Sequence, residues 1–396
     1  MNYFDNKNVN LDALKKKAYN LRWAEVEDGV IPLTAADPDF PCPPCVKEAM
    51  FNYIEDGYFS YTPKMGLEEF KHSFVRYAKE RKGEDIDPSL VLPVDSAARA
   101  MYIIAKAVLN KDDEMIVFDP CDFLFRESCL EAGGKAVFYP VALNPDTRKM
   151  DLSKLEDYIT PKTKMIGLCN PHNPYGLVYT KEELDYIMSL CEKHNLYIMN
   201  DEIWSDIIYS DAKFNSIYCL GNDRCKRVLS VFGYSKSFGL AGLRIGLAYT
   251  TNEELFKKIV EASDVLSTAG GATSISQVAA MAAMDGAKDW QAQFLTLLES
   301  NRNYAVDYIN KNINGLHAYL PQGTYLLYVD INDLKMEAVD FVEYLRKEEK
   351  LAVVPGGHNF FGDKSEGHVR ICIATSKEIL EEGLRRLKQG VEKLNK

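Results

Sequence analysis

The chain has 396 residues, of which 46% are hydrophobic and 27% charged, and its formal net charge is -11. This length and composition are typical of a soluble α/β protein in two parts, and they argue against a single small core. The acidic balance argues against nucleic acid or an anionic membrane as the main partner, and no apolar run reaches the roughly 18 residues of a membrane span.

The N-terminal segment gives no indication of targeting or of metal binding. Its start, MNYFDNKNVNLDALKKKAYN, lacks the apolar core of a signal peptide. Nine scattered cysteines suit a reducing compartment, so we expect a cytoplasmic protein. Cys42 and Cys45 form a C-x-x-C pair, but the chain has no second pair at the spacing of a zinc site. We therefore expect no metal.

Strand and helix patterns alternate through the middle of the chain. The segment 94–109 predicts a helix that begins near Ser96, Ala97 and Ala98, where free N–H groups and the helix dipole favour an anion. Another amphipathic helix is expected at 180–195, after a threonine cap. Apolar runs typical of strands buried on both faces lie at 115–120, 136–141, 164–169, 196–200, 228–232 and 245–250. The alternation predicts an α/β fold, with a mostly parallel sheet and helices on both faces.

The pattern changes after about residue 285. A long helix is expected at 290–312, followed by strands at 324–331 and 368–374 and a closing helix at 376–395. This order predicts a smaller α+β unit. We therefore expect a large domain over residues 45–285 and a small domain formed by residues 1–44 and 286–396.

Three polar side chains lie where a ligand is expected. Asn173, Asp201 and Lys236 each follow the end of one strand, in three successive strand–helix units. In a parallel sheet, such positions line the ligand crevice. A lysine can hold an aromatic aldehyde as a Schiff base, a carboxylate can keep a ring nitrogen protonated, and an amide can donate to a ring oxygen. Ser235 and Arg244 suit a phosphate. The set predicts pyridoxal 5'-phosphate as the cofactor, with Lys236 and Asp201 as the catalytic residues.

Six motifs together indicate one enzyme family: TAADPDFPCPP, YFSYTPKMGLEEF, NPHNPYG, DEIWSDIIY, SKSFGLAGLRIG and GHVRICIA. By these motifs the chain resembles a fold-type I pyridoxal-phosphate enzyme of the class I/II aminotransferase superfamily, over essentially its whole length. The resemblance implies a large sheet of the seven-stranded type and a smaller α+β domain. It also implies that Lys236 forms the internal aldimine, that Asp201 pairs with the pyridine nitrogen and that Asn173 bonds the ring oxygen.

The resemblance assigns the phosphate end of the cofactor to two segments. Ser235 and Arg244 would hold the phosphate with their side chains. Ser96 and the backbone of Ala97 and Ala98 would complete the phosphate site from the start of the predicted helix.

The resemblance also assigns residues outside the cofactor ring. Tyr61 would reach the phosphate of the neighbouring subunit's cofactor, which implies a homodimer with shared active sites. Arg370 would clamp the substrate α-carboxylate bidentately, with Asn173 beside it. Ala36 would line the carboxylate pocket.

Four positions depart from the family pattern: Ser96 stands where a glycine usually starts the phosphate-loop helix, Tyr175 stands where Thr is common, and the other two are Trp204 and Asp122. Trp204 stands three residues after Asp201, where aminotransferases usually have Tyr and cystathionine β-lyases His; its indole N–H donates but does not accept. Asp122 stands two residues after the proline of the DP pair, where the stacking aromatic usually lies, and Phe123 follows it. We place Phe123 and Trp204 in the cofactor pocket and leave the stacking residue open. Glu202 is expected to be solvated or to cap a helix.

The motifs divide between two reactions. NPHNP and DEIWSDIIY lean towards the carbon–sulfur β-lyase branch, which releases pyruvate, ammonia and a thiol. An arginine eight residues after Lys236, and HVRICIA without a following Cys-Pro, lean towards aminotransferases. We predict an aminotransferase that acts on an L-amino acid and a 2-oxo acid by a ping-pong mechanism. A β-lyase remains the alternative and a pyridoxal-phosphate-binding regulator a minor one, and the substrate side chain stays open.

Overall fold

The large sheet has seven strands in the order β2-β10-β9-β8-β7-β3-β4. The computed structural model describes residues 2–141, 143–144, 148–267 and 269–394. The strands from β9 to β4 run parallel, whereas β10 is antiparallel to both of its neighbours. All six predicted strand runs are confirmed. The bounds are β2 (Val91–Val94), β3 (Glu114–Asp119), β4 (Lys135–Pro140), β7 (Thr163–Cys169), β8 (Tyr197–Asp201), β9 (Val228–Gly233) and β10 (Gly246–Tyr249).

Strand β2 is the member of this sheet that the sequence does not predict. It has only four residues, all buried, and one of them is Pro93. Proline lacks the N–H that a central strand donates to its ladder, so its presence argues against a strand. β2 tolerates it because it lies at the edge of the sheet and pairs with β10 alone.

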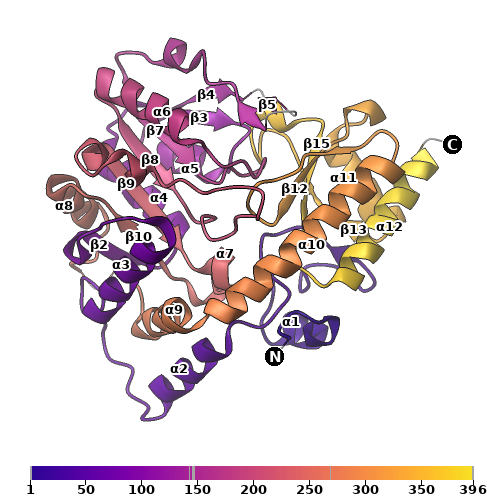
Figure 1. Ribbon diagram of the computed structural model, residues 1–396, viewed down its shortest axis with the longest axis horizontal. Helices are drawn as coiled ribbons and strands as arrows, with labels where there is room; N and C mark the ends of the chain where they lie inside the picture. Colours follow the sequence, from indigo (N-terminus) through magenta and orange to yellow (C-terminus); the bar gives the residue numbers. More distant parts are fainter. Residues whose placement is uncertain (1, 142, 145–147, 268, 395–396) are drawn as a thin grey trace.

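Helices flank the large sheet, as the alternation predicts (Figure 1). The predicted start at Thr180 is a full capping box with Glu183, and Ser96 caps its helix by accepting from the Arg99 N–H. None of the described helices combines the length and apolar character needed to cross a bilayer. The helices are α1 (Leu11–Lys16), α2 (Pro44–Ile54), α3 (Glu68–Lys82), α4 (Ala97–Val108), α5 (Leu124–Glu131), α6 (Lys181–Lys193), α7 (Ser235–Phe238), α8 (Glu253–Ala262), α9 (Ser274–Gly286), α10 (Lys288–Asn312), α11 (Ala338–Glu348) and α12 (Lys377–Leu394).

The C-terminal part forms a second, antiparallel sheet in the order β11-β12-β15-β14. It lies on the right of Figure 1 with α11 and α12, and the long helix α10 runs diagonally towards it. The predicted strands and the closing helix are confirmed as β12, β15 and α12, although residue 395 of that prediction lies outside the described residues. The bounds are β11 (His317–Ala318), β12 (Leu326–Asp330), β14 (Val354–Pro355) and β15 (His368–Cys372).

The N-terminal segment joins the C-terminal part. β1 (Ile31–Pro32) pairs in parallel with β13 (Leu351–Ala352). The division into a large domain, 45–285, and a small domain of residues 1–44 and 286–396 remains our proposal, and this pairing supports it.

Candidate active site

A cavity of about 330 Å³ lies beyond the carboxyl ends of β3, β7, β8 and β9. Because these strands are parallel, the segments that follow them meet at one edge of the sheet. The cavity brings together every site residue predicted from the sequence except Tyr61. Those residues are Ala36, Ser96, Ala97, Ala98, Phe123, Asn173, Asp201, Trp204, Ser235, Lys236, Arg244 and Arg370.

Lys236 follows β9 in the short helix α7 and points its amine into the cavity. Its Nζ donates to the backbone oxygen of Ala36 at 2.8 Å and lies 5.4 Å from the centroid of the Trp204 ring. Burial lowers the pKa of Lys236; the Asp37 and Asp122 carboxylates oppose this shift, and Arg370 adds to it. A lysine with a lowered pKa keeps more of its amine unprotonated, and the unprotonated amine is the form that acts as nucleophile or base.

Asp201 is the last residue of β8 and is buried, with 7% of its surface exposed. Its side chain accepts a hydrogen bond from the Ile203 N–H at 3.0 Å. Burial raises the pKa of the Asp201 carboxyl to about 7. A cation beside the carboxyl would favour its ionised form again, so this residue fits a protonated ring nitrogen.

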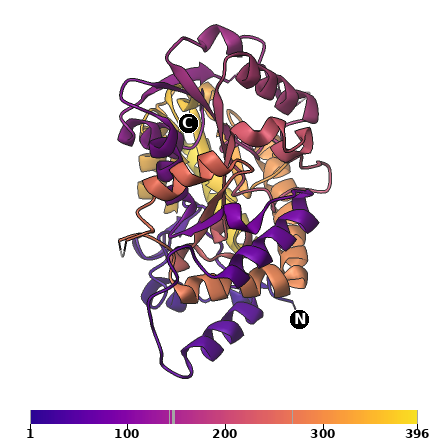
Figure 2. The same cartoon turned by 90° about the vertical axis from the view of Figure 1, so that its left-hand side faces the viewer.

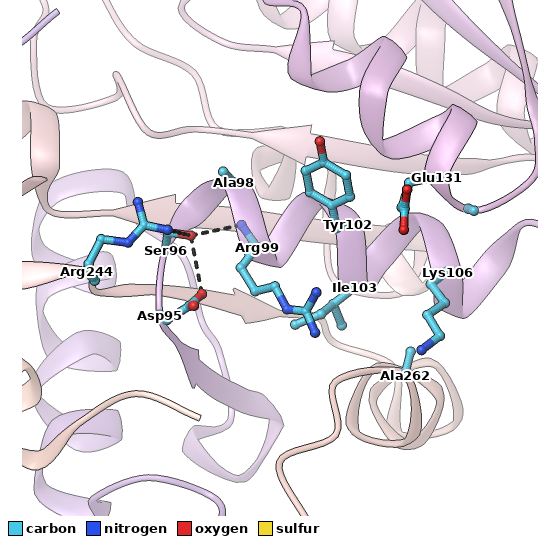
Figure 3. Close-up of a pocket in the computed structure, with 11 residues that line it drawn as sticks. Asp95, Ser96, Ala98, Arg99, Tyr102, Ile103, Lys106, Glu131, Arg244 and Ala262 are labelled. Carbon is cyan, nitrogen blue, oxygen red and sulfur yellow. Dashed lines mark hydrogen bonds between the residues drawn. The ribbon is translucent and has the colours of Figure 1, made fainter. Parts of the chain in front are cut away.

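One end of the cavity, where Ser96, Ala97, Ala98 and Arg244 line it, is built on the first turn of α4. Figure 3 shows Ser96 and Arg244 at this turn, in a view of a neighbouring pocket that shares them with the cavity. The Ser96 Oγ accepts from the Arg99 N–H at 3.0 Å and from the Arg244 guanidinium at 3.2 Å. Arg244 has a left-handed backbone, with φ of 51°. The free N–H groups at the start of this 12-residue helix, together with Arg244, suit a dianion.

Gly246 allows β10 to approach the start of α4. A Cβ at this position would lie 2.4 Å from the backbone N of Ala97, which no real contact permits. The shape of this end of the cavity therefore depends on the absence of a side chain at position 246 as well as on the polar groups that line it.

Arg370 enters the cavity from β15 of the second sheet. It donates from Nη1 to the Asn173 Oδ1 at 3.4 Å, and its guanidinium lies 4.8 Å from the centroid of the Phe361 ring. Its buried Nε has no hydrogen-bond partner among the described residues. A buried donor without a partner is costly, so Arg370 is well suited to receive a carboxylate.

Two aromatic residues of the prediction occupy different places in the cavity wall. Trp204 is 3% exposed and packs edge-on against Tyr325, with ring centroids 4.7 Å apart. Phe123 is 45% exposed and directly precedes α5. Trp204 therefore forms a buried, packed part of the cavity wall, whereas Phe123 lies where the cavity meets solvent.

Sequence reasoning left two side chains of this region out of the site. Asp122 lines the cavity and accepts from the Asn173 Nδ2 at 2.8 Å. The sequence does mark Asp122 as unusual, since it stands at the position expected for the stacking aromatic. Tyr325 donates its hydroxyl to the Ala36 oxygen at 3.1 Å, the same oxygen that Lys236 uses, and nothing in the sequence pattern indicated it.

Tyr61 lies outside the cavity of its own chain. It is 90% exposed in the loop between α2 and α3. Helix α2 and this loop project at the lower edge of the molecule in both views (Figures 1 and 2). Over the described ranges, no group of three or more His, Cys, Asp or Glu side chains is arranged to hold a metal ion.

The chain is similar to known proteins over nearly its full length. The family model described as aminotransferase class I and II matches residues 28–387. An aspartate aminotransferase of Bacillus subtilis (strain 168) is 31% identical over 386 residues, which cover 96% of this chain and 95% of the relative. The solved aromatic aminotransferase of Pyrococcus horikoshii OT3 superposes with a TM-score of 0.85 at 29% identity, covering 94% and 98% of the two chains. Cystalysin of Treponema denticola, solved with pyridoxal 5'-phosphate, shares the fold with a TM-score of 0.92 at 23% identity over 100% of both chains.

Proposed function

The chain belongs to the class I and II aminotransferase family, and from this premise we propose that it transfers an amino group from an L-amino acid to a 2-oxo acid. Pyridoxal 5'-phosphate is its cofactor. The observation that carries the proposal is the Lys236 amine, which shares one cavity with the buried Asp201 carboxyl and with the Arg370 guanidinium.

Each end of the cavity has a group that suits one part of the cofactor or the substrate. Arg244, Ser96, Ser235 and the first turn of α4 would hold the phosphate, and Asp201 would keep the ring nitrogen protonated. When bound, pyridoxal phosphate supplies an aldehyde carbon and a ring that accepts electrons.

The chain's own residues account for binding and proton transfer. Arg370 binds the α-carboxylate of the amino acid, with Asn173 beside it, and so limits how the substrate lies in the cavity. Lys236 Nζ, from the same cavity, removes the Cα proton and returns it to a different carbon. The lowered pKa of Lys236 favours the free amine that this step requires.

The first prediction concerns the half-reaction without a 2-oxo acid. Because transamination leaves the amino group on the cofactor, mixing the holoenzyme with its amino-acid substrate is expected to abolish the visible absorbance of the starting holoenzyme. One equivalent of 2-oxo acid is released per site, and adding a 2-oxo acid restores the spectrum. Absorbance and product release are measured together.

The same experiment tests the β-lyase alternative, which the motifs NPHNP and DEIWSDIIY favour. A β-lyase would release pyruvate, ammonia and a thiol from cystathionine while its spectrum returned to the starting form without any 2-oxo acid. That result would replace the transaminase proposal.

We further propose a homodimer in which Tyr61 of one subunit reaches the phosphate site of the other. Support comes from the apolar surface around this residue, where Tyr58, Phe59 and Tyr61 are 79%, 68% and 90% exposed. Exposed patches of this kind mark interaction surfaces. We also propose a cytoplasmic location, which nine free cysteines support.

The second prediction tests the shared site. Tyr61→Phe removes one hydroxyl donor to a charged phosphate, and we expect the dissociation constant of the cofactor to rise about tenfold or more. Tyr58→Phe is the matched control, because it removes a hydroxyl from the same exposed loop and is expected to change nothing. A monomer in sedimentation, or equal effects of the two variants, would contradict the proposal.

A further inference from the structure

Asp122 is a charged side chain of the cavity to which the proposed function gives no role. Arg244 is assigned to the phosphate, Arg370 to the α-carboxylate, Asp201 to the ring nitrogen and Lys236 to proton transfer. The Asp122 carboxylate remains in the wall of the same cavity.

Hydrogen bonds hold Asp122 in place beside the substrate clamp. Its Oδ1 accepts from the Leu124 N–H at 3.1 Å, at the start of α5, and its Oδ2 accepts from the Asn173 Nδ2 at 2.8 Å. The Oδ1 of the same Asn173 amide accepts from the Arg370 Nη1. The carboxylate is therefore fixed one amide group away from the guanidinium that binds the substrate.

The charge of Asp122 acts on several groups of the cavity, and it helps to raise the pKa of Asp201. It contributes to the pKa of Lys236 and of Arg370, the two groups that would contact the substrate. Asp37 adds a second negative charge near Lys236, with its carboxylate held by the Asn20 amide at 2.9 Å. In a partly buried cavity, such charges act more strongly than in water.

We propose that Asp122 sets the charge preference of the amino-acid site, so that the enzyme selects amino acids with a cationic side chain and disfavours dicarboxylic ones. This inference rests on the proposed function, because it describes the amino acid that Arg370 binds. A second carboxylate on the substrate meets repulsion from Asp122, whereas an ammonium or guanidinium group meets attraction.

Isosteric substrates isolate the charge. Glutamate and glutamine have the same shape, and lysine differs from norleucine chiefly by its ammonium group. We expect kcat/KM for glutamine to exceed that for glutamate by about tenfold or more, and lysine to exceed norleucine similarly. In Asp122→Asn, which keeps the size of the side chain, both ratios are expected to fall to within about threefold.

Matched variants separate this effect from a general loss of charge or of folding. Glu127→Gln removes a carboxylate from α5, the helix that begins two residues after Asp122; Glu127 pairs with Arg126 at 2.8 Å and does not line the cavity. Its substrate ratios are expected to equal those of the wild type. Asp122→Ser retains an oxygen for the Leu124 N–H and serves as a second variant if Asp122→Asn does not bind the cofactor.

A binding measurement keeps the inference apart from the proposed function. Glutarate and its monoamide, glutaramate, have no amino group, so neither can react. We expect the wild-type holoenzyme to bind glutaramate about tenfold more tightly than glutarate, and Asp122→Asn to bind them alike. If no amino acid changes the spectrum but this binding difference holds, the transaminase proposal falls and the charge preference stands. Equal binding by the wild type, or an unchanged difference in Asp122→Asn, overturns the role of Asp122.

Discussion

Replacing Lys236 with alanine is expected to lower kcat for transamination by at least about 10⁴-fold, because one side chain both carries the reactive amine and moves the substrate proton. Steady-state kinetics measure the loss. Lys236→Arg keeps a positive charge in the cavity but has no nucleophilic amine, so it is expected to lose as much. Lys257→Ala, on the exposed surface of α8, is the control and should retain full activity.

The same variant separates an enzyme from a non-catalytic regulator. If Lys236→Ala lost turnover and the covalently reducible cofactor together, an enzymatic role would be supported. Turnover within tenfold of the wild type would contradict the assignment of Lys236. Borohydride reduction followed by peptide mapping shows whether the cofactor is attached at this position.

Replacing Asp201 with asparagine is expected to lower kcat by about 10² to 10³-fold, since a neutral amide cannot balance the charge of a protonated ring nitrogen. The amide keeps the shape of the carboxyl, so the loss should appear in kcat more than in cofactor retention. Asp201→Glu, which keeps the charge, should recover part of kcat. Equal rates for Asp201→Asn and the wild type would remove Asp201 from the catalytic set.

Asp201 also makes a prediction for the cofactor-free protein. Its carboxyl has a pKa of about 7 in the folded protein, above the ordinary value of 3.8, because burial disfavours the ionised form. The folded state therefore holds this proton more tightly than the unfolded state. The stabilisation that the protonated Asp201 gives the folded state is complete below the unfolded pKa of 3.8 and is lost as the pH rises to about 7. Between pH 3.8 and about pH 7, the free energy of unfolding of the cofactor-free Asp201→Asn variant should fall less with rising pH than that of the cofactor-free wild type, as denaturant titration would measure.

The sequence predicts those site residues well that combine a reactive or polar side chain with a position directly after a strand. Asn173, Asp201 and Lys236 each follow a strand, and parallel strands bring such positions to one edge regardless of the details of packing. Once six apolar runs were recognised, the meeting of these three side chains in one cavity followed from topology.

Other features depend on contacts that no local pattern carries. Glu202 was expected to be solvated or to cap a helix, and this expectation is wrong. It is fully buried, and its carboxylate pairs with the buried Lys82 Nζ at 2.8 Å. The two residues are 120 positions apart, so only the folded chain reveals that they pair, with Glu84 as a second carboxylate 3.0 Å from the same amine. The antiparallel direction of β10 likewise could not be predicted, because an apolar run does not indicate which way its strand runs in the sheet.

The site also depends on residues that are distant in sequence. Lys236 bonds the backbone oxygen of Ala36, which is 200 positions away. Any backbone oxygen can accept such a bond, so residue identity gives no indication of it. Asp122 was visible as a departure from the family pattern, but its bond to Asn173 required the folded geometry.

The close approach of Gly246 to the start of α4 has a consequence for how this protein can change over generations. Substitutions in the walls of the cavity, such as those that alter substrate choice, leave the backbone where it is. Any side chain at position 246 would displace the start of α4, and with it the Ser96 and Ala97 backbone that lines the cavity. We therefore expect related sequences to vary at the side chains that line the cavity but to keep glycine at position 246.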